Sequence, residues 1–274
     1  MKKIVEMKYV LLVGLMLWSS LQGNAQKEGE FSVPLSDPGK RGMLRAQLNT
    51  GSITVRGSAR KDVLIKYRQV ESDRVHHKDS ESKNGMKRIS SGTMDLEVSE
   101  SNNQVKVGSD SWSNTVDLVI EVPSGFDMKV QAYNDGEIVI SNVQGQVEIT
   151  NYNGGISATE ISGSVVASSY NGDIKVGFAK LTPETPMSYS TYNGDIDLTF
   201  PAALKATLKM KTERGEIFTD FEVNLSKTGP IQKKETKSGT YRVTIDEWVT
   251  GDINGGGPEF TMKNYNGDIL IRKK

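Results

Sequence analysis

Hydrophobic and polar residues alternate with a period of two along much of the chain. In one segment Ile138 and Ile140 fall on one side of an extended backbone and Glu137 on the other, and Ile174 and Lys175 repeat the pattern further on. Such alternation is typical of a β-strand with one buried face. Because no segment beyond the N-terminal leader shows a sustained helical period, the sequence predicts an all-β protein with almost no helix.

A short motif, Tyr-Asn-Gly-Asp-Ile, recurs along the second half of the chain. Its isoleucines fall at positions 138, 156, 174, 196, 217 and 269, with spacings of 18, 18, 22, 21 and 52 residues. A repeat of about 20 residues is typical of a solenoid of stacked coils. The copies are 133–138, 152–156, 170–174, 192–196 and 265–269, with a degenerate copy at 213–217 and a first member at 49–53.

The Asn-Gly pairs allow two interpretations. In a β-hairpin, Asn-Gly joins neighbouring antiparallel strands through a tight turn. In a solenoid, residues that recur once per coil lie directly above one another, about 4.8 Å apart. Since the whole motif recurs at the spacing of one unit, we expect a parallel β-solenoid, similar to a β-helix, with coils of about 18–22 residues and irregular β caps.

The motif also predicts which residues form the turns. Asn and Gly both tolerate a positive φ, so they can form a sharp corner without steric strain. Stacked copies of the motif would place asparagine amides and tyrosine rings in two ladders. The expected turn residues are Asn134, Asn153, Gly154, Asn171, Gly172, Asn193, Gly194, Asn266 and Gly267.

Residues 1–25 have the features of a secretory signal peptide. Lys2 and Lys3 precede an apolar run, residues 9–18, and small residues follow at Gly23 and Ala25. The run is too short to span a bilayer as a helix, which needs about 20 residues. We therefore expect cleavage after Ala25 and export to the periplasm, the cell surface or the medium, the alternative being an uncleaved N-terminal anchor.

The rest of the chain divides into two parts. Residues 26–126 form an N-terminal β region that a polar loop at 71–93 interrupts. Residues 127–274 form the repeat solenoid, with an insertion at 222–262. Because the end coils of a solenoid expose hydrophobic residues, they need caps, and the N-terminal strands and the 222–262 segment are the candidates.

Composition excludes several classes of function. The chain contains no cysteine, so it has no disulfide, no thiolate metal site and no lipidated cysteine. Its 34 basic and 34 acidic residues balance, which argues against binding to nucleic acid or to an anionic membrane. After removal of the signal peptide no segment is long and apolar enough to cross a membrane.

Candidate chemistry is sparse, and we predict no catalytic residues, no metal site and no cofactor. The two histidines, His76 and His77, fall in the polar loop, so a Ser-His-acid triad cannot be assembled. Asp173, Asp195 and Asp268 occupy equivalent positions and are weak calcium candidates. The alternative is that these carboxylates accept hydrogen bonds from nearby backbone amides.

The tyrosines of the motif are the candidate binding residues. A column of Tyr133, Tyr152, Tyr170, Tyr192 and Tyr265 would offer aromatic surface with polar tips to a glycan or an envelope protein. The alternative is that the rings only stack on one another and protect a corner. A polysaccharide-processing enzyme on a β-helix fold is the competing class of function, since two suitably spaced carboxylates can perform acid and base catalysis.

The sequence resembles a known family. The segment Val119-Ile120-Glu121-Val122-Pro123-Ser124-Gly125, the Asn-Gly-Asp-Ile coils, Ile253-Asn254-Gly255-Gly256-Gly257-Pro258 and the closing Asn266-Gly267-Asp268-Ile269 are similar to the bacterial putative-adhesin domain family. The resemblance covers residues from about 45 to the end. It implies an exported β-solenoid domain without known catalytic residues, and hence an adhesin-like or envelope scaffold role that is not enzymatic.

Overall fold

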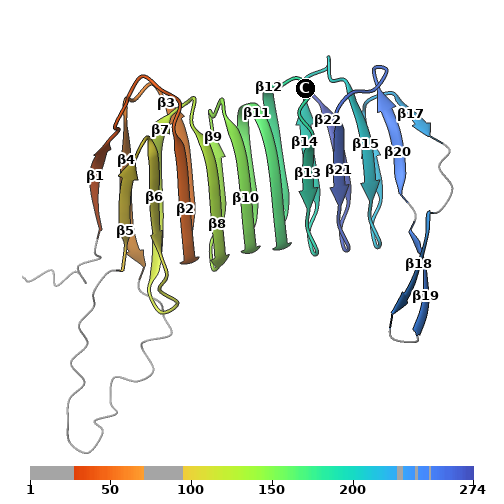
Figure 1. Ribbon diagram of the computed structural model, residues 1–274, viewed down its shortest axis with the longest axis horizontal. Helices are drawn as coiled ribbons and strands as arrows, with labels where there is room; N and C mark the ends of the chain where they lie inside the picture. Colours follow the sequence, from red (N-terminus) through yellow and green to blue (C-terminus); the bar gives the residue numbers. More distant parts are fainter. Residues whose placement is uncertain (1–27, 71–94, 227–230, 238–239, 247) are drawn as a thin grey trace, which may run out of the picture.

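The computed structural model describes residues 28–70, 95–226, 231–237, 240–246 and 248–274. The predicted signal peptide, residues 1–25, and the predicted polar loop, residues 71–93, lie outside the described residues. Every regular element in these described ranges is a β-strand, and most strands stack side by side in one long rack (Figure 1). The predicted all-β class is therefore confirmed.

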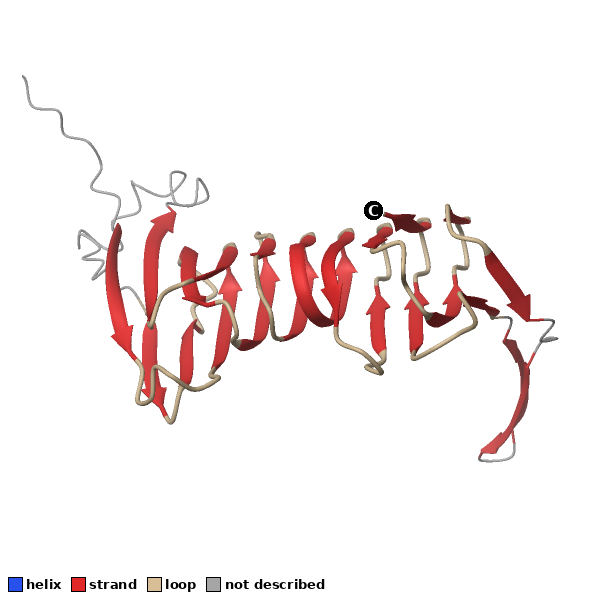
Figure 2. Ribbon diagram, turned by 90° about the horizontal axis from the view of Figure 1, so that it is seen from above, coloured by secondary structure: helices blue, strands red, loops and turns tan. Residues whose placement is uncertain are grey.

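The strands of the rack form two rows, which Figure 2 shows from above. Row A contains, in spatial order, β1 (Glu28–Pro34), β4 (Asp62–Val70), β7 (Thr115–Pro123), β3 (Ile53–Ser58), β9 (Ile138–Ser141), the first half of β11 (Ile156–Asn171), β12 (Ile174–Leu181), β14 (Ile196–Phe200), β22 (Ile269–Lys273) and β16 (Ile217–Thr219).

Row B completes each coil on the other side of the core. It contains, in spatial order, β5 (Glu97–Ser101), β6 (Gln104–Ser109), β2 (Met43–Thr50), β8 (Asp127–Asn134), β10 (Gln146–Asn153), the second half of β11, β13 (Met187–Ser190), β21 (Glu259–Lys263), β15 (Ala206–Lys211), β20 (Val249–Ile253) and β17 (Val223–Ser226).

Equivalent isoleucines lie in register down row A. Ile156 pairs in parallel with Ile138 on one side and with Ile174 on the other, and Ile174 pairs in parallel with Ile196. This register confirms the parallel β-solenoid. The hairpin interpretation is wrong for these turns, because each Asn-Gly turn joins a strand of row B to a strand of row A.

The stacking order of the coils differs from their order along the chain. The coil of β2 and β3 lies between the coils of β6–β7 and β8–β9. Near the other end, the coil of β21 and β22 lies between those of β13–β14 and β15–β16, as Figure 1 shows. The coil of β2 and β3 and the C-terminal coil of β21 and β22 therefore each lie between coils that are not adjacent to them along the chain.

Antiparallel strands close both ends of the rack. β4 pairs antiparallel with β7 and β1 with β4, while β20 pairs antiparallel with β15 and β17 with β20. The predicted insertion, residues 222–262, thus supplies β17 and β20 to an end of the rack but β21 to an interior coil. Its remaining strands, β18 (Ile231–Lys237) and β19 (Thr240–Asp246), pair only with each other.

A single cluster of buried hydrophobic side chains fills the space between the rows. The motif isoleucines belong to it, except Ile217, which is partly buried against it. Each fully buried isoleucine contributes roughly 2–3 kcal/mol relative to an exposed one. Aromatic rings also stack from coil to coil, with Phe178 and Phe200 at 5.1 Å and Phe200 and Phe260 at 5.5 Å. The alternate residues of each strand point away from this core and form the surface of the protein.

Candidate binding surface

The tyrosines of the motif form a stacked ladder along the edge of row B. The ring centroids of Tyr152 and Tyr170 are 4.9 Å apart, those of Tyr170 and Tyr192 are 5.0 Å apart, and those of Tyr192 and Tyr265 are 4.8 Å apart, with ring planes within 5° of parallel. Because the ring faces cover one another, the ladder presents ring edges and hydroxyl groups to solvent. Tyr152 is the most exposed of the first three, at 49%.

The two ends of the ladder differ. At one end the guanidinium of Arg214 lies over the ring of Tyr265, 5.5 Å from its centroid. At the other end Tyr133 leaves the regular stack, since its ring lies 6.0 Å from Trp112 at an angle of 55°. Trp112 is 63% exposed and Tyr133 is 38% exposed. The fifth predicted tyrosine therefore belongs to a separate aromatic pair, in which Trp112 is the more exposed ring.

The asparagines that follow the tyrosines form an amide ladder. Each Nδ2 group donates a hydrogen bond to the Oδ1 of the asparagine in the neighbouring coil. The bonds run from Asn153 to Asn134 (2.8 Å), from Asn171 to Asn153 (2.8 Å), from Asn193 to Asn171 (2.7 Å) and from Asn266 to Asn193 (2.6 Å). These bonds lock the turns of successive coils together and hold the tyrosines beside them in register.

The glycines of the motif allow the turns of neighbouring coils to touch. Gly172 has φ +154° and Gly194 has φ +142°. A Cβ atom at Gly172 would lie 2.2 Å from the carbonyl oxygen of Gly154, and one at Gly194 would lie 2.5 Å from that of Gly172. The glycine is therefore required by the contact between coils as well as by the turn itself.

A polar column inside the turns was not predicted from the sequence. Five polar side chains form it, and each belongs to the residue just before a motif tyrosine or before the equivalent Glu213. Each side chain donates a hydrogen bond to the carbonyl oxygen of the turn glycine one coil away. A polar residue before four of the five motif tyrosines is the sequence signal that could have revealed it. The donors and acceptors are Asn151 to Gly136 (2.9 Å), Ser169 to Gly154 (3.2 Å), Thr191 to Gly172 (2.9 Å), Asn264 to Gly194 (3.3 Å) and Thr212 to Gly267 (3.0 Å).

The acidic residues of the motif accept backbone hydrogen bonds from the next coil. Oδ1 of Asp173 accepts from the N–H of Asp195 at 2.9 Å, and Oδ1 of Asp195 accepts from the N–H of Asp268 at 2.8 Å. Oδ1 of Asp268 accepts in turn from the N–H of Glu216 at 2.8 Å. Within the described ranges no three His, Cys, Asp or Glu side chains lie close enough together to hold a metal ion. These carboxylates hold coils together.

Small polar side chains lie beside the tyrosine ladder on the outer face of row B. Thr150 is in register with Gln131 on one side and with Ser168 on the other, and Ser168 is in register with Ser190. The hydroxyl of Ser168 lies 3.4 Å from that of Thr150. The row combines hydroxyl and amide groups with the tyrosine edges, so this face can make many hydrogen bonds to one extended ligand.

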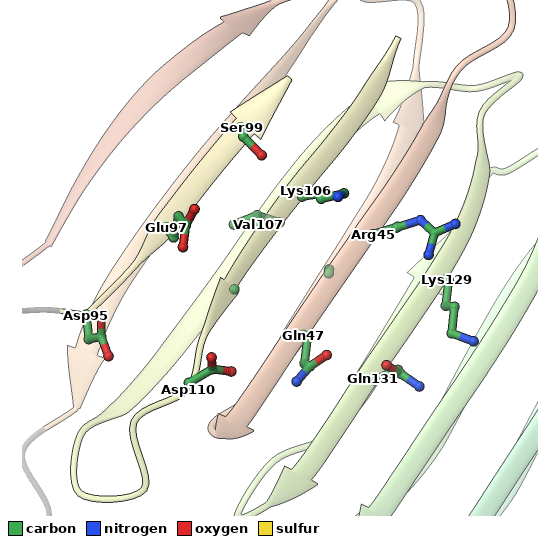
Figure 3. Close-up of a pocket in the computed structure, with 12 residues that line it drawn as sticks. Arg45, Gln47, Asp95, Glu97, Ser99, Lys106, Val107, Asp110, Lys129 and Gln131 are labelled. Carbon is green, nitrogen blue, oxygen red and sulfur yellow. The ribbon is translucent and has the colours of Figure 1, made fainter. Parts of the chain in front are cut away.

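A groove opens at the N-terminal end of the same face. It lies over β5, β6, β2 and β8 and has a volume of about 400 Å³. Figure 3 shows the side chains of Arg45, Gln47, Lys129 and Gln131 reaching outward from β2 and β8. The sequence did not predict this groove, because its walls come from strands that are distant along the chain.

Comparison with known proteins agrees with the fold. Residues 127–254 match the family model Toastrack DUF4097. This match confirms the predicted family resemblance. No curated protein matches the sequence. The described residues contain no helix that is long and apolar enough to span a membrane.

Two solved structures resemble the chain. One is a putative cell adhesion protein from Clostridium sporogenes, 10% identical, with a TM-score of 0.45 over 91% of this chain and 100% of that one. The other is a putative adhesin from Bacteroides fragilis, 9% identical, with a TM-score of 0.36 over 92% of this chain and 98% of that one.

Proposed function

We propose that the protein is an exported, adhesin-like binding protein without catalytic activity, and that it binds a glycan or an envelope protein on the outer face of row B. The observation that carries this proposal is the continuous polar and aromatic strip on that face. Its tyrosine rings stack at 4.8–5.0 Å, so hydroxyl groups repeat at the spacing of the coils. An extended ligand that follows the strip would meet the same groups once per coil.

The rigidity of the strip supports a binding role. The amide ladder, the polar column and the backbone pairing fix the position of each tyrosine before a ligand arrives. A surface that is already ordered loses little conformational entropy on binding, which favours affinity. Ligand contacts would come from tyrosine hydroxyls and from side chains such as Thr150 and Ser190, which lie beside the ladder.

The proposal that the protein is not an enzyme rests on the role of its regularly spaced carboxylates. Asp173, Asp195 and Asp268 each use Oδ1 to accept a backbone hydrogen bond from the next coil. This structural role explains why they recur at equivalent positions of their coils. The proposal of export rests on the lysines and the apolar run within residues 1–25.

An array of bacterial envelope polysaccharides and purified envelope proteins would test the proposal. We expect the purified protein to bind at least one of them with a dissociation constant of about 1–100 μM, a range typical of surfaces with few buried anchor residues. The bound polysaccharide should be recovered with its length unchanged. New reducing ends or unsaturated products would contradict the non-catalytic role, and the absence of any binding would contradict the binding role.

Replacement of tyrosines by phenylalanine separates binding from stability. The double variant Tyr170→Phe/Tyr192→Phe keeps the stacked rings but removes two exposed hydroxyls, so its melting temperature should stay close to that of the wild type. Binding should weaken about five- to tenfold, as expected for the loss of one or two hydrogen bonds. Lys175→Gln, on the outer face of row A, is the matched control and should bind normally. Wild-type affinity in the double variant would assign the ladder a purely structural role.

A further inference from the structure

The groove at the N-terminal end of row B carries an unusual arrangement of charge. Arg45 of β2 is directly in register with Lys106 of β6 on one side and with Lys129 of β8 on the other. Like charges directly opposite each other on neighbouring strands are destabilising. Of the three, only Lys129 forms an ion pair, with Glu148 at 2.6 Å. Arg45 and Lys106 have no ion-pair partner in the part of the chain that the structure describes. The positive charges of Arg45 and Lys106 are therefore available to bind an anion.

The next row of the groove offers neutral hydrogen-bonding groups. Gln47 is in register with Gln131, two positions along the same strands, and the two amides point outward (Figure 3). Neither side-chain amide forms a hydrogen bond with another described residue, so both keep their donors and acceptors for a ligand. Gly108 lies next to Gln47 in the same row, and its lack of a side chain deepens the groove between Gln47 and Glu97.

An exposed aromatic pair borders the amide row. Tyr133 follows Gln131 by two residues, so both side chains lie on the outer face of β8. The ring of Trp112 lies 6.0 Å from that of Tyr133 at 55°, and 63% of Trp112 is exposed. Trp112 is more exposed than any tyrosine of the ladder. Aromatic rings with one apolar face and a polar edge suit ligands that have both an apolar surface and hydroxyl groups.

The basic row, the amide row and the aromatic pair together indicate which ligand the groove would bind. We infer that the groove binds an acidic oligosaccharide, with a carboxylate or sulfate group on Arg45 and Lys106, sugar hydroxyls on Gln47 and Gln131, and a sugar ring against Trp112. Arginine provides a planar fork of donors that matches a carboxylate or sulfate. This inference deepens the proposed function and depends on it.

The acidic residues of the groove limit which anions fit. Glu97 begins β5, Asp95 lies just before it, and Asp110 lies beyond the end of β6, so carboxylates border the groove on the side away from β8 (Figure 3). A polymer with a charge on every backbone unit would bring further negative groups next to these carboxylates. A sugar chain in which neutral hydroxyl surface surrounds each acidic group avoids that repulsion. The groove should therefore prefer acidic sugars to dense linear polyanions.

Titration of the purified protein with matched oligosaccharides would test this inference. The probes are a uronate oligosaccharide, a sulfated oligosaccharide and a neutral oligosaccharide of equal length, with polyphosphate as a polyanion that is not a sugar. We expect at least one of the two acidic sugars to bind about tenfold or more tightly than the neutral one, and to lose affinity as salt is raised. The stronger of the two identifies the acidic group. Equal binding of the neutral sugar, or tighter binding of polyphosphate, would overturn the inference.

Variants of matched charge locate the site. Arg45→Gln should weaken acidic-sugar binding about tenfold or more, and Arg45→Lys should restore part of it, because the charge returns without the planar fork. Trp112→Ala should weaken binding about fivefold or more. The control is Arg56→Gln, which removes the same charge from the exposed face of β3 in the same coil, and it should bind as the wild type does. Normal binding by Arg45→Gln would overturn the site.

The outcome also separates this inference from the proposed function. If the protein ignores both acidic sugars but binds another glycan or a protein on the outer face of row B, the groove assignment fails and the proposed function stands. If it binds no member of the envelope array, both fail. Melting temperatures of all variants should be measured, so that a loss of binding is attributed to the site only in a folded protein.

Discussion

Ile196 and Ile269 are neighbours in row A although 73 residues separate them along the chain. Ile217 follows Ile196 by only 21 residues, yet it lies one coil further out and pairs with Ile269 instead. The last coil of the chain is therefore an interior coil, and the antiparallel strands β20 and β17 form the end of row B. Long-range pairing of this kind makes the C-terminal coil essential to the continuity of the core.

Ending the chain after residue 257 should disrupt the C-terminal part of the rack. The truncation removes β21 and β22, so β14 and β16 lose the strand that lies between them in row A. The buried side chains of Phe260, Ile269 and Ile271 are also lost. We expect the melting temperature to fall by about 10 °C or more, given the typical cost of removing several buried side chains.

Deletion of the β18–β19 hairpin is the control for that truncation. Strands β18 and β19 form a two-stranded sheet of their own, and the described strands of the rack do not pair with it. Replacing them by a short glycine-serine linker should change the melting temperature by no more than about 2 °C. A truncated chain that melts like the wild type would show that the C-terminal coil is dispensable.

Gly172→Val should destabilise the protein through a contact between coils. The new Cβ would lie 2.2 Å from the carbonyl oxygen of Gly154, at a residue with φ +154°. The clash can be relieved only if the two turns move apart, which also strains the amide ladder. We therefore expect the melting temperature to fall by about 5–10 °C. Gly177→Val, in the same coil, is the matched control, because a Cβ there meets nothing within 4 Å. Equal melting of the two variants would contradict the role given to the turn glycines.

Asn171→Asp should break one bond of the amide ladder. Asn171 donates to Oδ1 of Asn153 at 2.8 Å and accepts from Nδ2 of Asn193 at 2.7 Å. An ionised aspartate can still accept but cannot donate, so its oxygen would face that of Asn153 without a proton between them. Chemical denaturation at neutral pH should show a loss of about 1–3 kcal/mol. Asn102→Asp, at an exposed turn, should be nearly neutral; a similar loss there would indicate a general effect of charge.

Calcium should leave the stability unchanged. Oδ1 of Asp195 already accepts the N–H of Asp268 at 2.8 Å, and the carboxylates of the column recur once per coil instead of converging on one point. Thermal melts with calcium and with a chelator should therefore agree within about 1 °C. A rise with calcium that saturates, and that Asp195→Asn abolishes, would establish a calcium site in the column.

The sequence predicted the local structure of each coil better than the arrangement of the coils. The spacing from Ile156 to Ile174 and the Asn-Gly pairs were enough to predict parallel stacking, because equal residues at equal spacing favour one register. The order of the coils was not predictable in this way. Ile217 and Ile269 belong to equivalent motifs, so the pattern alone does not say which of them lies next to Ile196.

For the same reason, only part of the candidate binding surface could be predicted from the sequence. The tyrosine and asparagine ladders follow from the repeat, and the structure places Tyr152, Tyr170, Tyr192 and Tyr265 in one stack. The groove lies outside the repeat. Arg45 meets Lys106 and Lys129 only because β2 lies between β6 and β8, and that placement is a property of the whole topology.

The most direct test of the account is a comparison of two blocked faces in one coil. Thr150→Arg places a bulky side chain on the outer face of row B, between Gln131 and Ser168, and Ser157→Arg places the same side chain on the outer face of row A. Affinity for the ligand identified on the envelope array should fall about tenfold or more in Thr150→Arg and stay unchanged in Ser157→Arg. Loss of binding in Ser157→Arg alone, with both variants folded, would place the contact surface on row A and contradict the account.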